Sequence, residues 1–214
     1  MIRKELTAFC LAAMTVFAIE PTKPIYSNIV YSVQPGDTIW GISARTGTDI
    51  ASILDANNLV NPDLIYIGDK LSIPPKLSAD TVAVLNQAKS MIGNYKYVWG
   101  GSEPSDGGFD CSGFMHYIFG FGGEDLPHSA HMQAVLGQPV SESQIRPGDV
   151  IYFQNTYTQS YNPPVTHCGI YIGQNHMIMA EMKRDTILTT TMWGNPYWVQ
   201  HFWGIRRFIP ITGA

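Results

Sequence analysis

A cysteine and a histidine in two separate segments form the strongest chemical pattern in this sequence. Cys111 lies in residues 109–114 (FDCSGF), and His167 opens the apolar residues 167–173 (HCGIYIG). A thiol becomes a strong nucleophile when a base takes its proton, and histidine is a common base for this task. A lone cysteine is more often a small buried apolar residue, so the histidine is what favours catalysis. The pair predicts attack of a thiolate on an amide or ester carbon.

This chemistry needs a helix that begins at Cys111 and a strand that carries His167. Backbone N–H groups and the helix dipole favour a thiolate at a helix N-terminus. Neighbouring residues of a strand face opposite sides, so Cys168 is predicted to lie in the core, away from the imidazole. A preceding helix, ended by Gly93 and Asn94, is predicted from apolar residues at helical spacing. These are Val82, Leu85, Ala88, Met91 and Ile92.

Composition narrows the possible classes of protein. The 214 residues suffice for one ordinary domain and a small module, with 45% hydrophobic and 14% charged residues. A net charge of −4 without clusters of basic residues gives no indication of a nucleic-acid partner. Two of the three cysteines, Cys111 and Cys168, lie outside the first 18 residues, and two are too few for a disulfide scaffold. No zinc-binding motif occurs. We therefore expect no metal and no cofactor.

The N-terminus has the pattern of an export signal. Basic residues Arg3 and Lys4 precede the apolar residues 6–17, and small residues near Ala18 suit cleavage. The apolar stretch is shorter than the roughly 20 residues that span a bilayer. We predict a signal peptide at 1–18 and a linker at 19–30, with no stable membrane span after cleavage. A first helix of the fold, or a retained anchor, is the alternative.

Residues 31–74 show the pattern of a compact strand–helix–helix–strand module. The stretches YSVQPGDTIWGISARTG and NNLVNPDLIYIGDKLSIP closely resemble a LysM module. The resemblance implies binding to the N-acetylglucosamine-containing glycan strands of peptidoglycan, in a shallow groove between two loops. The alternative is that the loop residues merely form the turns of the fold. The contact residues that it implies are Gly36, Asp37, Thr38, Asn61, Asp63 and Ile65.

After a predicted linker at 75–80, residues 81–212 resemble the NlpC-type (p-sixty) cell-wall cysteine peptidases. Four segments carry the resemblance: 97–101, 109–114, 126–133 with 145–153, and 167–173. It implies an α+β fold, a reduced papain-like domain in which the helix bearing the cysteine packs on an antiparallel sheet. In this resemblance Cys111 is the nucleophile and His167 the base.

The resemblance also implies roles for three neighbours of the nucleophile. Tyr97 matches a tyrosine that lines the site and can donate to the oxyanion or the substrate, although a packed strand aromatic is equally compatible with the sequence. Asp110 and Ser112 flank the nucleophile and help some members recognise the stem peptide. Their alternative role is to cap the helix.

The sequence departs from the family where a third polar residue should orient the imidazole. That residue is usually a histidine twelve positions after the base, and here it is Met179, a poor hydrogen-bond acceptor. Glu181 shares a strand face with Met179 and could serve instead, or could be an exposed strand-end carboxylate. His176 would need a bulge, and a backbone carbonyl or water is a further possibility.

Two smaller departures lie at the predicted cleft. Residues 154–165 (QNTYTQSYNPPV) form a long insertion just before the histidine, where loops carry specificity. His128 stands where family members usually have arginine after the proline of the third segment.

Together these features predict an exported peptidoglycan hydrolase, secreted or periplasmic and associated with the cell wall. The resemblance implies a cysteine endopeptidase that cleaves a stem-peptide amide after γ-linked D-glutamate, while the LysM module holds glycan strands. Two alternatives remain. One is a wall-binding protein whose peptidase domain is inactive or weakened by Met179. The other is amide or acyl transfer on a different substrate by the same thiol chemistry.

Overall fold

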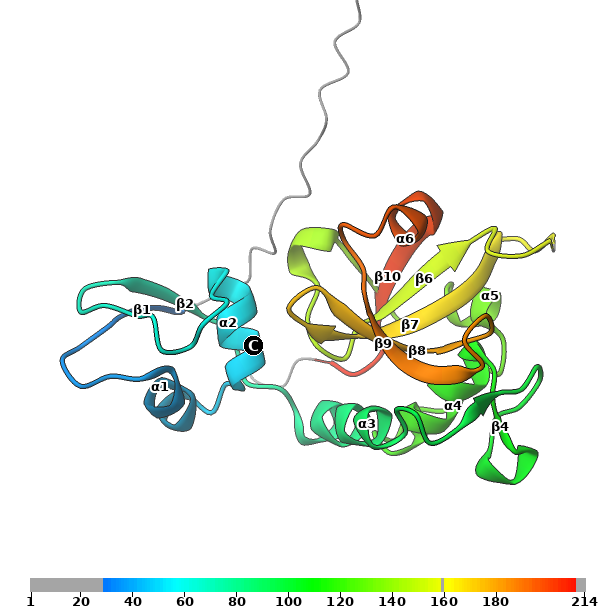
Figure 1. The fold of residues 1–214 in the computed structure, drawn as a ribbon, viewed down its shortest axis with the longest axis horizontal. Helices are drawn as coiled ribbons and strands as arrows, with labels where there is room; N and C mark the ends of the chain where they lie inside the picture. Colours follow the sequence, from blue (N-terminus) through cyan, green and yellow to red (C-terminus); the bar gives the residue numbers. More distant parts are fainter. Residues whose placement is uncertain (1–28, 159, 211–214) are drawn as a thin grey trace, which may run out of the picture.

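The computed structural model describes residues 29–158 and 160–210 of the chain. The predicted signal peptide at 1–18 and residues 19–28 of the predicted linker therefore lie outside the described residues. Figure 1 shows two parts, a small N-terminal module and a larger domain built around a sheet.

The N-terminal module contains the predicted order of elements: strand β1 (Ile29–Ser32), helix α1 (Ile39–Thr46), helix α2 (Ile50–Asn57) and strand β2 (Lys70–Ile73). Strands β1 and β2 pair antiparallel. Each helix begins where a side chain accepts a backbone N–H, from Gly41 to Thr38 and from Ser52 to Asp49. A small apolar core between the helices and the two strands holds the module together.

The larger domain has a six-stranded antiparallel sheet in the order β5-β10-β6-β7-β8-β9. Its strands are β5 (Gln138–Val140), β6 (Val150–Gln154), β7 (Val165–Gly173), β8 (His176–Glu181), β9 (Thr186–Thr191) and β10 (Phe202–Arg207). Its helices are α3 (Ala79–Ser90), α4 (Cys111–Gly120), α5 (Ala130–Gln133) and α6 (Pro196–His201). Short strands β3 (Lys96–Tyr97) and β4 (Gly108–Phe109) pair parallel, and 3₁₀ turns occupy Pro104–Asp106 and Glu142–Gln144. The α+β class and the helix packed on an antiparallel sheet are confirmed.

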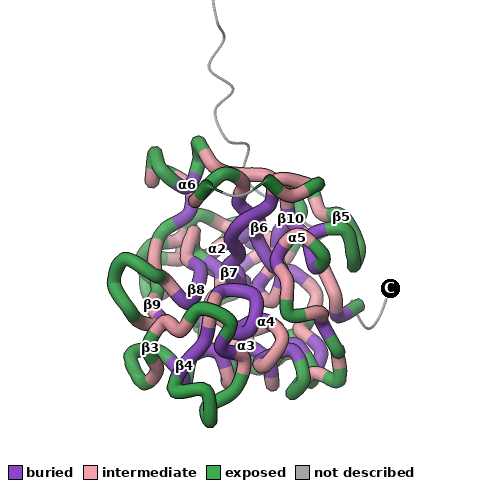
Figure 2. The backbone as a smooth tube through the Cα atoms, turned by 90° about the vertical axis from the view of Figure 1, so that its right-hand side faces the viewer, coloured by how far each residue is buried: buried purple, intermediate pink, exposed green. Residues whose placement is uncertain are grey.

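The sheet is covered on both faces, and alternate residues of one strand serve different cores. Val150 and Tyr152 of β6 pack with helices α3 and α4, whereas Ile151 and Phe153 pack on the opposite face with Trp198 of α6. Figure 2 shows the buried backbone running through β6, β7 and α4 in the centre of the domain. This two-sided burial fixes the position of β7, the strand that carries His167.

Helix α3 corrects one detail of the predicted core. Val82 and Ile92 are 41% and 38% exposed, so they do not belong to the buried face. The helix spans Ala79–Ser90, so it ends before the predicted Gly93 and Asn94 and leaves Ile92 outside it. It turns Thr81, Val84, Leu85 and Ala88 inward. Because α3 packs against the domain on one side only, a narrow stripe is buried and its apolar flanks remain in contact with solvent.

The N-terminal module contacts the larger domain through α2. The hydroxyl of Tyr171 on β7 donates to the Asp55 carboxylate at 2.9 Å, and the backbone N–H of Gln174 donates to the other oxygen at 3.0 Å. One carboxylate thus connects α2 to the turn between β7 and β8.

Candidate active site

Cys111 is the first residue of α4, and the residue before it caps the helix. The Asp110 carboxylate accepts the backbone N–H of Gly113 at 2.7 Å and the Ser112 hydroxyl at 3.0 Å. Its second oxygen lies 3.0 Å from His128 Nε2 and accepts the backbone N–H of Gly100 at 3.0 Å. Asp110 therefore caps the helix, which was the alternative role considered for it. Its carboxylate also faces the cleft beside the thiol.

Close packing holds the start of α4 against the preceding loop. A Cβ atom on Gly113 would collide with the backbone oxygen of Gly101, so this position admits glycine only. Helix α4 also packs against β7, the strand that carries His167. Cys111 and His167 are 6% and 8% exposed, so both reacting groups border the cleft while being nearly removed from water.

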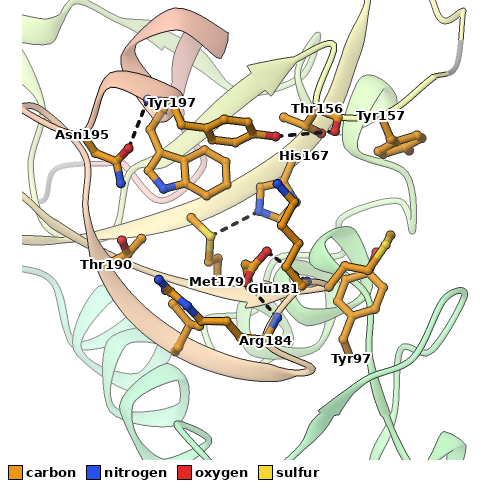
Figure 3. A pocket seen from close by; sticks show the side chains of 14 residues that line it. Tyr97, Thr156, Tyr157, His167, Met179, Glu181, Arg184, Thr190, Asn195 and Tyr197 are labelled. Carbon is orange, nitrogen blue, oxygen red and sulfur yellow. Dashed lines mark hydrogen bonds between the residues drawn. The ribbon is translucent and has the colours of Figure 1, made fainter.

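The imidazole of His167 makes a sulfur contact where a polar partner was expected. Its Nε2 lies 3.3 Å from Met179 Sδ, and Figure 3 shows this contact. Thioether sulfur is a weak acceptor. Because Nε2 is turned toward Met179, Nδ1 is the ring nitrogen left to take the proton of the thiol.

Aromatic rings hold the imidazole plane. Trp198 of α6 stacks on the His167 ring with 5.3 Å between centroids and 15° between planes. Phe153, opposite His167 on β6, lies 6.1 Å from the same ring. Stacking thus fixes the plane of the imidazole, whereas Met179 Sδ occupies the place of the hydrogen-bond partner that a third polar residue provides in other thiol hydrolases.

The second thiol lies directly behind the nucleophile. Cys168 is fully buried, as predicted, and its Sγ donates to the backbone oxygen of Cys111 at 3.3 Å. Hydrogen bonding from the Cys168 thiol and the charge of His167 lower the pKa of Cys111, against the opposing effect of burial. Burial raises the pKa of Cys168, so Cys168 stays protonated as a donor.

Replacement of Cys168 by alanine should make Cys111 less acidic. The variant loses the thiol hydrogen bond that favours the Cys111 thiolate, so the pKa of Cys111 should rise toward the ordinary value of about 8.5. The rate of alkylation by iodoacetamide, measured against pH, should shift to higher pH by about one unit. Serine at position 168 restores a donor and is the matched control. An identical pH profile for wild type and the alanine variant would contradict this role.

Two phenols border the nucleophile. Tyr97 of β3 and Tyr157 of the 154–165 insertion line the space on both sides of the dyad. Burial, followed by the nearby charge of Cys111, raises the pKa of both phenols. Both hydroxyls therefore remain protonated at neutral pH and are suited to donate to an oxyanion.

Two cavities flank the dyad. One of about 320 Å³ contains Cys111 with Asp110, Ser112 and Tyr97. The other, of about 240 Å³, contains His167 with Met179 and Glu181. Tyr157 lines both and meets Trp99 edge-on at 5.3 Å, so the insertion borders the cleft as predicted.

Glu181 lies in the histidine cavity but bonds elsewhere. Its carboxylate oxygens accept the backbone N–H groups of Lys183 and Arg184, each at 3.0 Å. In the part of the chain that the structure describes, the side-chain contact at Nε2 comes from Met179 and not from Glu181. His176 is likewise turned away, with Nδ1 at 2.6 Å from the backbone oxygen of Gln174.

The predicted glycan contacts lie in the N-terminal module, apart from the cysteine site. Several of their side chains have structural partners: Asp37 binds Arg45 and the Tyr31 hydroxyl, Thr38 caps α1, and Asn61 accepts the N–H of Asp63. Ile65 packs on the module core, and Gly36 has φ of 83°, a conformation that favours glycine. A glycan bound there would rely largely on backbone groups of these two loops.

Sequence reasoning did not assign a role to Trp198, nor to Tyr157 individually. Trp198 lies beyond the last matching segment, and no spacing rule links it to His167. Asn195 and Pro196 at the start of α6 signal a helix N-terminus, but nothing local indicates that this helix covers the imidazole. Within residues 29–158 and 160–210 no cluster of three side chains that could hold a metal ion occurs.

A thiol at a helix start, a histidine on an antiparallel sheet and nearby phenols define a papain-like thiol hydrolase site. The pattern that describes the NlpC/P60 family matches residues 93–207, and that of the LysM domain matches residues 31–74. The chain belongs to the NlpC/P60 family, whose members are cysteine peptidases. In the described residues no helix is long and apolar enough to cross a membrane.

Relatives with similar sequences support this assignment. The chain is 40% identical over 148 residues to a gamma-DL-glutamyl hydrolase of Bacillus subtilis, an alignment that covers 69% of this chain and 34% of the relative. It is 28% identical over 199 residues to a probable endopeptidase p60 of Listeria seeligeri, covering 73% and 36%. The chain thus spans about a third of the length of these relatives.

A solved structure agrees with the fold. The crystal structure of an NLP/P60-family protein similar to lipoproteins, from Staphylococcus aureus, superposes with a TM-score of 0.55 at 32% identity. The superposition covers 64% of this chain and 44% of that one.

Proposed function

We propose that this protein is an exported cysteine endopeptidase that hydrolyses an amide of the peptidoglycan stem peptide after γ-linked D-glutamate. The observation that carries the proposal is the buried pair of Cys111, at the start of α4, and His167, on β7. The name of the Bacillus subtilis relative supports a γ-glutamyl bond, and the LysM match supports peptidoglycan as the polymer. The proposed location is secreted or periplasmic, associated with the cell wall.

The arrangement can perform both halves of such a reaction. The Cys111 thiolate attacks the carbonyl carbon, and the negative charge that develops on oxygen faces the Tyr97 hydroxyl and the start of α4. His167 then gives its proton to the leaving amine, which departs and leaves a thioester. Water next attacks the thioester, His167 accepts a proton from it, and the acid product and free thiol are released.

A second candidate is a wall-binding protein that cuts slowly or not at all. The specific observation in its favour is the contact between Met179 Sδ and His167 Nε2, because a thioether stabilises the imidazolium poorly. The stacking of Trp198 maintains the plane of the ring but contributes no compensating negative charge.

Incubation of residues 19–214 with purified sacculi tests the proposal. Mass spectrometry of the soluble products should show fragments that end in γ-D-glutamate. Deletion of residues 31–74 should slow the release of soluble products from insoluble sacculi by about tenfold or more, because the LysM module holds the enzyme on that polymer. Hydrolysis of soluble fragments should be unchanged. Sedimentation of the protein with sacculi in the absence of any product would favour the second candidate.

A further inference from the structure

The cavity beside His167 is placed to receive one particular part of the substrate. His167 lines this cavity of about 240 Å³, whereas Cys111 lines the cavity on the other side of the dyad. The base returns its proton to the leaving amine, so the residue that follows the scissile amide must lie on the histidine side. Figure 3 shows Glu181, Arg184 and Thr190 among the residues around this space.

The charges in this cavity are unequal. Lys183 and Arg184 contribute two cations, and Glu181 contributes one carboxylate. That carboxylate already accepts two backbone N–H groups, from the same Lys183 and Arg184. Glu181 therefore shapes the turn that presents the cations, and the surplus positive charge is available to a ligand.

This turn is fixed at several points. At its far end, the Asp185 carboxylate accepts the backbone N–H of Tyr97 at 3.2 Å. The Lys183 ammonium lies 5.1 Å from the centre of the Tyr197 ring, a cation–π contact that holds it over the cavity wall. A cationic pair on an ordered turn binds an anion at a smaller entropic cost than one on a free loop.

We propose that this cavity binds the residue on the leaving side of the scissile amide and recognises a free carboxylate on it through Lys183 and Arg184. The inference rests on the proposed γ-glutamyl hydrolysis. Two substrates share this chemistry: a stem peptide whose diamino acid carries a second carboxylate, and a chain of γ-linked glutamates whose next residue carries its α-carboxylate. A diamino acid with that group amidated lacks the anion.

The test compares γ-D-glutamyl peptides that differ only in this group, as carboxylate or as carboxamide, together with a γ-linked glutamate oligomer. The wild-type chain should cleave the carboxylate peptide with kcat/KM about tenfold higher than the carboxamide, a difference of about 1.4 kcal/mol. In the Lys183→Gln/Arg184→Gln double variant this preference should vanish, because the KM for the carboxylate peptide rises toward the KM for the carboxamide. Lys89→Gln, an exposed lysine on α3, is the matched control and should keep the preference.

Equal rates of wild type on carboxylate and carboxamide would overturn the inference while leaving γ-glutamyl hydrolysis intact. A preference that survives in the double variant would overturn the assignment to Lys183 and Arg184. Failure to cleave any of the γ-glutamyl amides would overturn both the inference and the proposed function. Between the two carboxylate substrates, the one whose cleavage falls more in the double variant identifies the leaving residue that the cavity fits.

Discussion

Replacement of Cys111 by alanine is expected to lower the rate of peptidoglycan hydrolysis by at least about a thousandfold. The variant lacks the atom that forms the thioester, and His167 alone offers no comparable nucleophile. Alanine fits the first position of α4, where Asp110 continues to cap the helix, so the melting temperature should change little. Product release from sacculi and thermal melting, measured on the same preparation, check both expectations.

Thiol labelling provides an independent test of the same residue. Iodoacetamide should modify Cys111 well before Cys168, because the pKa of Cys111 is lowered and its side chain lines a cavity, whereas burial raises the pKa of Cys168. Peptide mass spectrometry at short reaction times measures the order of labelling. Equal labelling of the two thiols, or hydrolysis by Cys111→Ala at the wild-type rate, would eliminate the thiol mechanism.

Replacement of Met179 by histidine is expected to raise turnover by about tenfold or more. The new side chain stands where Met179 Sδ now lies, 3.3 Å from His167 Nε2, and a ring nitrogen there accepts the imidazole N–H far better than a thioether does. Met179→Leu is the control of similar volume, and it should change turnover by less than about threefold if methionine only packs against the ring. Rates should be measured on one soluble muropeptide, with folding checked by melting.

Glu181→Gln tests whether Glu181 orients the imidazole in place of the missing third residue. Glu181 binds the backbone of the following turn, and glutamine retains an acceptor oxygen, so turnover should remain within about threefold of wild type. A sharp loss of turnover in Glu181→Gln, together with no gain in Met179→His, would show that Glu181 acts on the imidazole during the reaction. Turnover unchanged in both variants would mean that stacking by Trp198 already provides the orientation that catalysis needs.

The sequence itself determined the local features of this protein. The strand–helix–helix–strand order of residues 31–74 was predicted, and Thr38 and Asp49 begin its helices because a short polar side chain there accepts the free N–H groups. The alternation along a strand predicted that Cys168 is buried while His167 faces the cleft. The residues around Cys111 and His167 indicated the cysteine–histidine pair, and the resemblance of four segments to the NlpC-type peptidases implied the α+β fold.

Tertiary structure decided what depends on contacts between distant segments. The inward face of α3 depended on which side α4 and the sheet cover, so Val82 became exposed, and Ile92 lies beyond the end of the helix and is exposed as well. The orientation of the imidazole came to depend on Trp198, which approaches His167 only because α6 folds over the outer face of the sheet. Parity along β8 allowed Glu181 to reach toward the base, but two nearby backbone N–H groups bind its carboxylate first. Local sequence patterns determine which side chains lie on each face of an element, whereas tertiary packing determines which of these side chains come into contact.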